Sequence, residues 1–311
     1  MKESYRKDRI DPELVKRAHT WPLTRCVVAA GNIYQELTWR GAKAPAGMEE
    51  GLLVTKGYRG LPLKTAVFSP KGVRSPMPAL IYVHGGAFVY KASVHQKKHA
   101  LLYAKKAGCR VFFPHFHLAP KYPYPAAYED VLSLCRYVAG HADALGVDAA
   151  RIGLAGNSAG ASIAALVCSR WEAEGIRRPC LQMLLYPVTD AGMETESMKC
   201  YTDTPQWNSR LNQRMWRWYC GRDPGLRYRA SPMHSPLPSV IPKTYLETAQ
   251  FDCLHDEGLL YGEKLKKAGA DVVINDTRGT YHAYDGQMNA GVVRQAMKRR
   301  IAFLKRGFAA R

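Results

Sequence analysis

Short apolar segments alternate with longer segments of helical spacing along most of the chain. The apolar segments lie at residues 61–69, 79–83, 110–113, 151–155, 181–186, 243–249 and 271–276. Strands of this length separated by helices are typical of parallel sheets. The pattern therefore predicts an α/β fold, with a mostly parallel central sheet and helices on both faces. With 311 residues, of which 47% are hydrophobic, the chain can bury one large core.

Two stretches fall outside this alternation. Residues 1–50 are charged and aromatic, and Pro22 and Pro45 interrupt any long helix there. Residues 191–235 carry aromatic side chains among polar residues, namely Trp207, Trp216, Trp218 and Tyr219. We therefore divide the chain into an N-terminal segment, 1–50, and an α/β domain, 51–311, with an insertion at about 191–235.

The sequence Gly156-Asn157-Ser158-Ala159-Gly160 lies between the strand predicted at 151–155 and the helical segment 162–167. A serine with a glycine two residues away on each side is typical of a nucleophile elbow, because larger side chains would collide in so tight a turn. The helix that follows brings its positive end near the serine, which favours a developing anion. A glycine-rich turn with an inert serine is the alternative.

An oxyanion donor loop, an acid and a histidine are also needed, in the order loop, serine, acid, histidine. The segment His84-Gly85-Gly86-Ala87-Phe88 follows the strand predicted at 79–83. Paired glycines let the backbone turn its N–H groups toward a ligand. We expect the N–H groups of Gly85, Gly86 and Ala159 to stabilise an oxyanion.

Asp252 follows the strand predicted at 243–249, where a carboxylate can orient a histidine. Asp256 is the alternative, but it opens a helical segment, where acidic residues usually stabilise the helix end. His282 is the last histidine of the chain and follows the last predicted strand. These positions predict a catalytic triad of Ser158, Asp252 and His282.

The remaining histidines receive simpler interpretations. His84 is expected to brace the donor loop rather than to transfer protons. His115 and His117 alternate at a strand end, a spacing that suits a metal, but the sequence offers no third ligand nearby. We therefore expect neither a metal nor an organic cofactor.

These motifs, together with Leu118-Ala119-Pro120-Lys121-Tyr122-Pro123-Tyr124-Pro125 and Leu185-Tyr186-Pro187-Val188-Thr189-Asp190, carry a resemblance over about residues 60–305. The chain resembles the hormone-sensitive-lipase-like (bacterial type IV) esterases of the α/β-hydrolase fold. The resemblance implies that Ser158 is the nucleophile, Asp252 the acid and His282 the base. It also implies that the two outlying stretches form a helical cap over the site.

Four aromatic or small residues are candidates for the substrate pocket: Ala87, Phe88, Trp216 and Tyr219. For the two cap residues, an equal alternative is that they only fasten the cap to the core.

The chain departs from the family pattern at several positions. Ala87 replaces the third glycine of the donor loop, and Asn157 replaces the aspartate that often precedes the serine. His115-Phe116-His117 replaces Asp-Tyr-Arg, so the contacts of that ion pair must be made differently. Ala283-Tyr284 replaces Gly-Phe after the histidine. None of these changes removes a predicted catalytic group.

The formal net charge is +19, which is compatible with a nucleic-acid-binding protein. The basic residues are spread over the chain, however, and no nucleic-acid-binding motif accompanies them. We favour a solvated basic surface, with attraction to anionic polymers as a minor alternative. Eight cysteines without a Cys-x-x-Cys pair, no signal-peptide pattern and no apolar run of 18 residues predict a cytoplasmic protein without a membrane span.

The sequence thus predicts a serine carboxylester hydrolase that acts on short-chain, acetyl-type esters through an acyl-enzyme. Its expected partner is a small-molecule ester rather than nucleic acid, and a homodimer is left open. An amidase or peptidase with the same triad is one alternative. A non-catalytic protein that binds a ligand or nucleic acid is the other.

Overall fold

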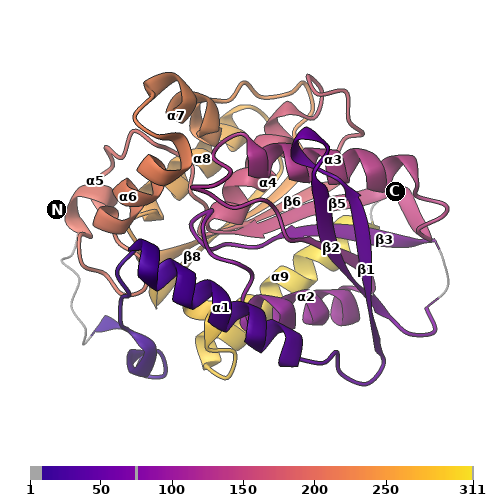
Figure 1. Ribbon diagram of the computed structural model, residues 1–311, viewed down its shortest axis with the longest axis horizontal. Helices are drawn as coiled ribbons and strands as arrows, with labels where there is room; N and C mark the ends of the chain where they lie inside the picture. The colour runs from indigo at the N-terminus through magenta and orange to yellow at the C-terminus, as the bar shows by residue number, and fades with distance from the viewer. Residues whose placement is uncertain (1–8, 74–75, 310–311) are drawn as a thin grey trace.

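The computed structural model describes residues 9–73 and 76–309. In this part of the chain, eight strands form one sheet in the order β1-β2-β4-β3-β5-β6-β7-β8 (Figure 1). β1 pairs antiparallel with β2 and β2 with β4, and the remaining neighbours are parallel. The strands are β1 (Met48–Lys56), β2 (Pro62–Pro70), β3 (Met77–Val83), β4 (Arg110–Pro114), β5 (Val147–Asn157), β6 (Leu181–Leu185), β7 (Lys243–Phe251) and β8 (Val272–Tyr281).

Helices cover both faces of the sheet. Figure 1 shows two helices below the sheet in that view, α2 (Val94–Ala107) and α9 (Gly291–Ala309). Three helices lie above it, α3 (Ala126–Gly140), α4 (Ala159–Arg170) and α8 (His255–Lys267). The predicted α/β-hydrolase fold, with a mostly parallel sheet between two helical layers, is therefore confirmed.

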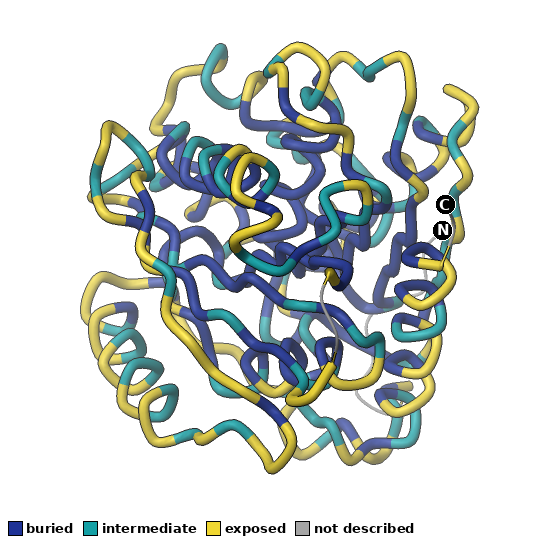
Figure 2. Tube along the Cα trace, turned by 90° about the vertical axis from the view of Figure 1, so that its right-hand side faces the viewer, coloured by how far each residue is buried: buried dark blue, intermediate teal, exposed yellow. Residues whose placement is uncertain are grey.

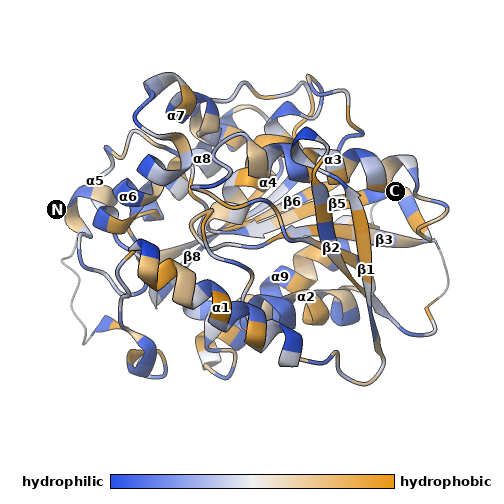
Figure 3. Ribbon diagram, viewed as in Figure 1, coloured by the Kyte–Doolittle hydropathy of each residue, from blue (hydrophilic) through white to orange (hydrophobic). Residues whose placement is uncertain are grey.

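The core follows the central strands. Every residue of β3 and β6 is buried, as expected for strands that have helices on both sides. The buried segments form the centre of the molecule in Figure 2, and apolar residues follow the same central strands in Figure 3. β1 differs, because Leu52 and Val54 are 66% and 53% exposed at the edge of the sheet.

The two outlying stretches meet each other. In the N-terminal stretch, α1 (Arg25–Gly41) fits between the two prolines that interrupt the helical pattern. The stretch 191–235 contains α5 (Glu196–Cys200), α6 (Ser209–Cys220) and α7 (Pro224–Ala230). The N–H of Gln206 donates to the carbonyl of His19 at 3.0 Å, and Arg214 donates to the carbonyl of Leu23 at 3.0 Å. Residues 1–8 of the predicted N-terminal segment lie outside the described residues.

Helices able to cross a bilayer, judged by length and apolar character, are absent from residues 9–73 and 76–309.

Candidate active site

Ser158 occupies a sharp turn between the end of β5 and the start of α4. Its φ of 55° and ψ of −123° are unfavourable for a residue with a side chain. The glycines on either side allow this turn. A Cβ on Gly156 would lie 2.4 Å from the backbone of Gly160, and a Cβ on Gly160 would lie 2.2 Å from the carbonyl oxygen of Val83. The two glycines therefore let the neighbouring backbone segments approach closely, and this packing holds Ser158 in its strained conformation.

A chain of hydrogen bonds joins three side chains from different strand ends. Ser158 Oγ lies 2.9 Å from His282 Nε2, and His282 Nδ1 lies 2.6 Å from Asp252 Oδ2. Asp252 is fully buried, and its second oxygen accepts the N–H of Leu254 at 3.0 Å. The three residues follow β5, β7 and β8. Since these strands are parallel, their carboxyl ends meet at one edge of the sheet.

The competing carboxylate serves another contact. Asp256 Oδ2 accepts the N–H of Ser197 at 2.9 Å, and Asp256 Oδ1 lies 2.9 Å from His255 Nδ1. Asp256 therefore fastens α8 to α5, whereas Asp252 contacts His282.

The donor loop differs from the expectation at one residue. The N–H of Gly85 does not face an open site, because it donates to Asn157 Oδ1 at 2.9 Å. Among the described residues, the N–H groups of Gly86, Ala87 and Ala159 have no hydrogen-bond partner. Gly86 and Ala87 have φ values of 125° and 54°, which turn their amides out of a regular strand. The free donors beside Ser158 are therefore Gly86, Ala87 and Ala159 rather than Gly85, Gly86 and Ala159.

Asn157 connects the elbow to this loop, a role that the sequence reasoning missed. Besides the Gly85 N–H, its Oδ1 accepts from Gln96 Nε2 at 3.3 Å and from Tyr82 Oη at 3.4 Å. Its Nδ2 donates to Tyr186 Oη at 3.4 Å. The position next to the predicted nucleophile was the available signal, and its partners come from segments that no local pattern connects.

His84 lies under the donor loop, where it was expected. Its Nδ1 lies 2.7 Å from the carbonyl oxygen of Gly85, and its ring stacks on Phe116 with centroids 4.3 Å apart. Burial lowers the pKa of His84 to about 3. The imidazole is therefore neutral near pH 7 and packs as an aromatic ring.

The segment that replaces the family's Asp-Tyr-Arg is fastened by a buried carboxylate. Asp130 Oδ2 accepts the N–H of His117 and lies 2.8 Å from His117 Nδ1. Its other oxygen accepts the N–H of Tyr58 at 2.7 Å. His115 instead packs edge-on against Trp39, with ring centroids 4.9 Å apart. The two histidines that alternate along the chain thus have separate surroundings.

A buried arginine on α9 joins the two segments that carry Asp252 and His282. Arg300 is 0% exposed and forms ion pairs with Glu247 in β7 and with Asp285, three residues after His282. Tyr186 donates to Asp285 Oδ1 at 2.8 Å, and its ring lies edge-on to His282, with centroids 5.0 Å apart.

Charge sets the ionisation of this cluster. Burial alone would raise the pKa of the Asp285 carboxyl, but Arg300, helped by His99 and His95, holds that pKa well below its ordinary value. Asp285 therefore stays ionised, and the guanidinium neutralises carboxylates from two segments at once.

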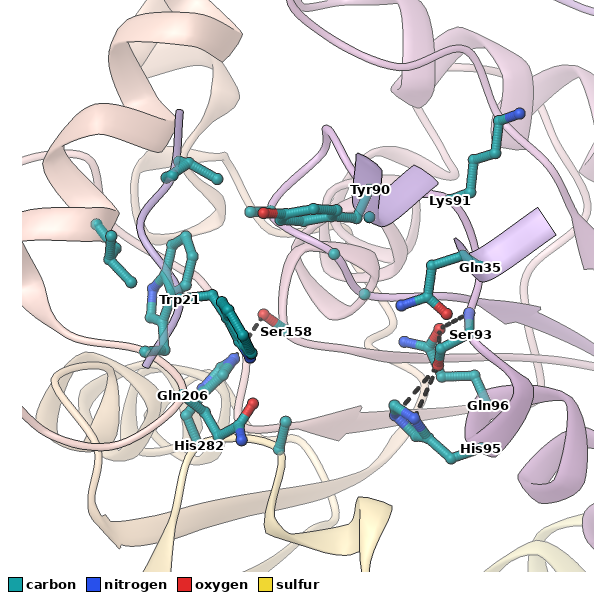
Figure 4. A pocket seen from close by; sticks show the side chains of 18 of the residues that line it. Trp21, Gln35, Tyr90, Lys91, Ser93, His95, Gln96, Ser158, Gln206 and His282 are labelled. Atoms are coloured by element: carbon teal, nitrogen blue, oxygen red, sulfur yellow. Dashed lines mark hydrogen bonds between the residues drawn. The ribbon is translucent and has the colours of Figure 1, made fainter. Parts of the chain in front are cut away.

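Ser158 and His282 line a cavity of about 740 Å³ (Figure 4). Much of its wall comes from the two outlying stretches, through Trp21, Val27, Tyr34, Trp207 and Leu211 among others. Ala87 lines the cavity, as the sequence predicted. The resemblance implied that the N-terminal stretch covers the site, but the sequence did not single out which of its residues line the cavity.

Phe88, Trp216 and Tyr219 lie elsewhere. None of the three is among the residues that line this cavity. Each is at most 1% exposed, and the rings of Phe88 and Tyr219 stack with centroids 3.7 Å apart. Their aromatic area is used to pack α6 against the donor loop, which is the fastening role given above as the alternative.

Comparison with known proteins identifies the family. Residues 80–285 match a family defined by the α/β-hydrolase fold. Carboxylesterase NlhH from Mycobacterium tuberculosis is 30% identical over 97% of both chains, and esterase LipI from the same species is 32% identical over 75% of this chain and 73% of its own. A bacterial heroin esterase superposes with a TM-score of 0.90 at 26% identity, covering 97% of this chain and 99% of its own. The chain belongs to the hormone-sensitive-lipase-like esterase family of the α/β-hydrolase fold.

Proposed function

We propose that this protein is a serine carboxylester hydrolase that cleaves short-chain acyl esters. The observation that carries the proposal is the series of hydrogen bonds from Ser158 through His282 to Asp252. Ser158 and His282 also line a cavity that a substrate can enter. The names of similar proteins, which include a carboxylesterase and a heroin esterase, support the same reaction class.

In the proposed reaction, Ser158 Oγ attacks the ester carbonyl while His282 Nε2 accepts the serine proton. Asp252 holds the imidazole through Nδ1 and stabilises its protonated form. The N–H groups of Gly86, Ala87 and Ala159 stabilise the oxyanion, and the start of α4 adds its positive end.

The tetrahedral species collapses when its bond to the alcohol oxygen breaks and His282 returns the proton to that oxygen. Water then repeats the sequence on the acyl-enzyme, releasing the acid and restoring Ser158. Besides the ester and water, these steps use only groups of the chain itself.

The preference for short acyl groups rests on the cavity. Its volume is about 740 Å³, and residues on α1 and before α6 contribute to its wall. A cavity of this size can hold a small soluble ester whole, and the name of a similar protein from Pseudomonas putida, ethyl acetate hydrolase, supports the short acyl group.

Ser158→Ala tests the nucleophile. We expect hydrolysis of p-nitrophenyl acetate to fall by at least about 10⁴-fold, since the acyl-enzyme cannot form. Circular dichroism should show an unchanged fold. A folded variant with normal turnover would refute the nucleophile assignment.

Asp252→Asn tests the acid, with Asp256→Asn as a matched control. The first change should lower kcat by about 10⁴-fold, because the imidazole loses the partner that fixes its tautomer. The second should leave kcat within about threefold, since Asp256 contacts Ser197 and His255 instead. The reverse result would move the role to Asp256.

A further inference from the structure

The active-site cavity has a polar end that the proposed reaction does not use. Figure 4 shows His282 and Gln206 on one side of Ser158, and Ser93, His95 and Gln96 on the other. All of these residues line the same cavity. This arrangement bears on which part of an ester would meet the polar side chains.

The reaction proposed above sets the direction of the substrate, and the inference rests on it. His282 must protonate the leaving alcohol, so the alcohol part lies on the His282 side. Trp207 flanks that side, with its ring centroid 6.1 Å from that of His282. The acyl part therefore extends away from His282, toward the polar end.

The polar end is held firmly in place. Ser93 precedes α2, and both its N–H and its hydroxyl lie within 3.0 Å of Gln96 Oε1. Gln96 Nε2 donates to Asn157 Oδ1 at 3.3 Å. Ser93 and Gln96 are only 6% and 5% exposed. Most hydrogen-bonding groups of Ser93 and Gln96 are thus already paired, either with each other or with Asn157.

His95 retains hydrogen-bonding capacity. Its Nδ1 and Nε2 lie 2.9 Å and 3.3 Å from the same atom, Ser93 Oγ. Because the two ring nitrogens point in diverging directions, one oxygen can be well aligned with only one of them, which leaves the other nitrogen for a ligand. Burial lowers the pKa of His95, while Asp285 opposes the shift and Arg17 and Lys98 add to it. A neutral ring can present either an N–H or a lone pair to a ligand. A hydroxyl group satisfies both cases, because it donates and accepts.

The charges around this end offset one another, because Arg17 and Lys98 act on His95 in opposition to Asp285, so they do not single out an anionic group. Lys91 lines the cavity, but its ammonium is ion-paired with Glu36, which also pairs with Arg40. Gln35, which lines the same region from α1, is uncharged.

We propose that Ser93, His95 and Gln96, together with Gln35, form an acyl subsite that selects esters of hydroxy acids. An apolar acyl group of the same length would cover these polar atoms without replacing their bonds to water, which reduces its rate. We expect a hydroxyl at the matching position to raise kcat/KM by about 5- to 50-fold over the deoxy ester.

The test compares ethyl butanoate with its 2-hydroxy and 3-hydroxy derivatives, each in both configurations. Monoethyl succinate probes a carboxylate, and 2-hydroxyethyl butanoate places the hydroxyl on the alcohol instead. One of the hydroxyacyl esters should be preferred by the stated factor. A preference for the succinate would overturn the neutral subsite, and a gain confined to 2-hydroxyethyl butanoate would overturn its acyl position.

His95→Phe should bring the ratio of hydroxyacyl to acyl kcat/KM close to one. His141→Phe is the matched control, since His141 is exposed at the end of α3 and does not line the cavity. Gln35→Leu, on the outer helix α1, provides a second variant if His95→Phe does not fold, and it should lower the ratio at least twofold. Ratios that stay at the wild-type value in folded variants would refute the subsite.

The two proposals fail in different ways. If the unaltered protein hydrolyses none of these esters and no p-nitrophenyl acetate, the proposed reaction is wrong. If it hydrolyses ethyl butanoate but shows no preference for any hydroxy ester, only the subsite is wrong.

Discussion

Asn157 has a larger part in the site than its place beside the serine suggests. Its carboxamide accepts from Gly85 and Gln96 and donates toward Tyr186. An amide that both donates and accepts can connect a loop, a helix and a tyrosine at one point. Asn157 is thus a positioning residue for the donor loop, although it does not itself face the reacting atoms in the proposed mechanism.

Asn157→Ala should lower kcat for p-nitrophenyl acetate by about 10²-fold, the usual effect of losing one oxyanion donor. The reason is that the Gly85 N–H loses its acceptor and the neighbouring N–H groups lose their alignment. KM should change little. Asn157→Asp retains the Oδ1 acceptor and should recover most of the rate. Equal activity of the alanine and aspartate variants would contradict this role.

Among the elements, α9 has an effect on the site without touching the cavity. Arg300 pairs with Glu247 in β7 and with Asp285 after β8. These are the segments that carry Asp252 and His282, so one side chain of α9 fixes the spacing between them. Removal of one partner from a buried ion pair is strongly destabilising, because it leaves uncompensated charge.

Arg300→Met should lower the free energy of unfolding in urea by about 3–5 kcal/mol. Arg299→Met is the matched control, because Arg299 is exposed. Within the described residues, its side chain forms one hydrogen bond, to Asn275 Oδ1 at 2.8 Å. It should cost no more than about 0.5 kcal/mol. If both variants lost a similar amount of unfolding free energy, the ion pairs of Arg300 would contribute no more than an exposed contact does.

The sequence predicted elements well where order is local. The apolar segments anticipated β2 to β8. The central strands β3, β4 and β6 are nearly continuous apolar runs, and β2, β7 and β8 each contain a shorter apolar cluster. β1 was missed because its apolar run, Leu52 to Val54, is only three residues long and is flanked by charged and polar residues. Its order comes from antiparallel pairing with β2, an interaction between segments that a local pattern does not contain.

In the candidate site too, the residues marked by local patterns were predicted, and those that depend on distant contacts were not. Strand ends and the glycine spacing were enough to single out Ser158, Asp252 and His282, which the structure brings within hydrogen-bonding distance. The use of the Gly85 N–H and the burial of Trp216 and Tyr219 depend on contacts between distant segments. Sequence spacing alone does not determine such contacts.

The molecule as a whole keeps several histidines neutral in its interior. Burial lowers the pKa of His84 to about 3, and that of His99 and His115 to about 4. The ordinary value is about 6.5. At a pH between about 4 and 6.5, these histidines bind protons in the unfolded chain but stay neutral in the folded one. The resulting stability is therefore complete above about pH 6.5 and is lost as the pH falls toward 4.

The free energy of unfolding in urea should be smaller at pH 5 than at pH 7.5, by about 1–2 kcal/mol for each such histidine. His84→Phe keeps a ring against Phe116 and should reduce this difference by about that amount. His141→Phe, at an exposed site, should keep the full difference. A stability that is the same at both pH values would contradict the neutral, buried state of these rings.

The origin of the cavity wall has a consequence for how this protein can change. Gly31 on α1 approaches Tyr90 so closely that an added Cβ would lie 2.9 Å from its ring, and Trp21 and Tyr34 border the same space. Gly31 and Tyr34 lie on this peripheral helix and Trp21 lies just before it, while the proposed reacting groups lie at strand ends. Exchange of α1 for that of a relative could redirect which esters enter while leaving the bond-breaking apparatus intact, so selectivity and reactivity can evolve on separate parts of the polypeptide.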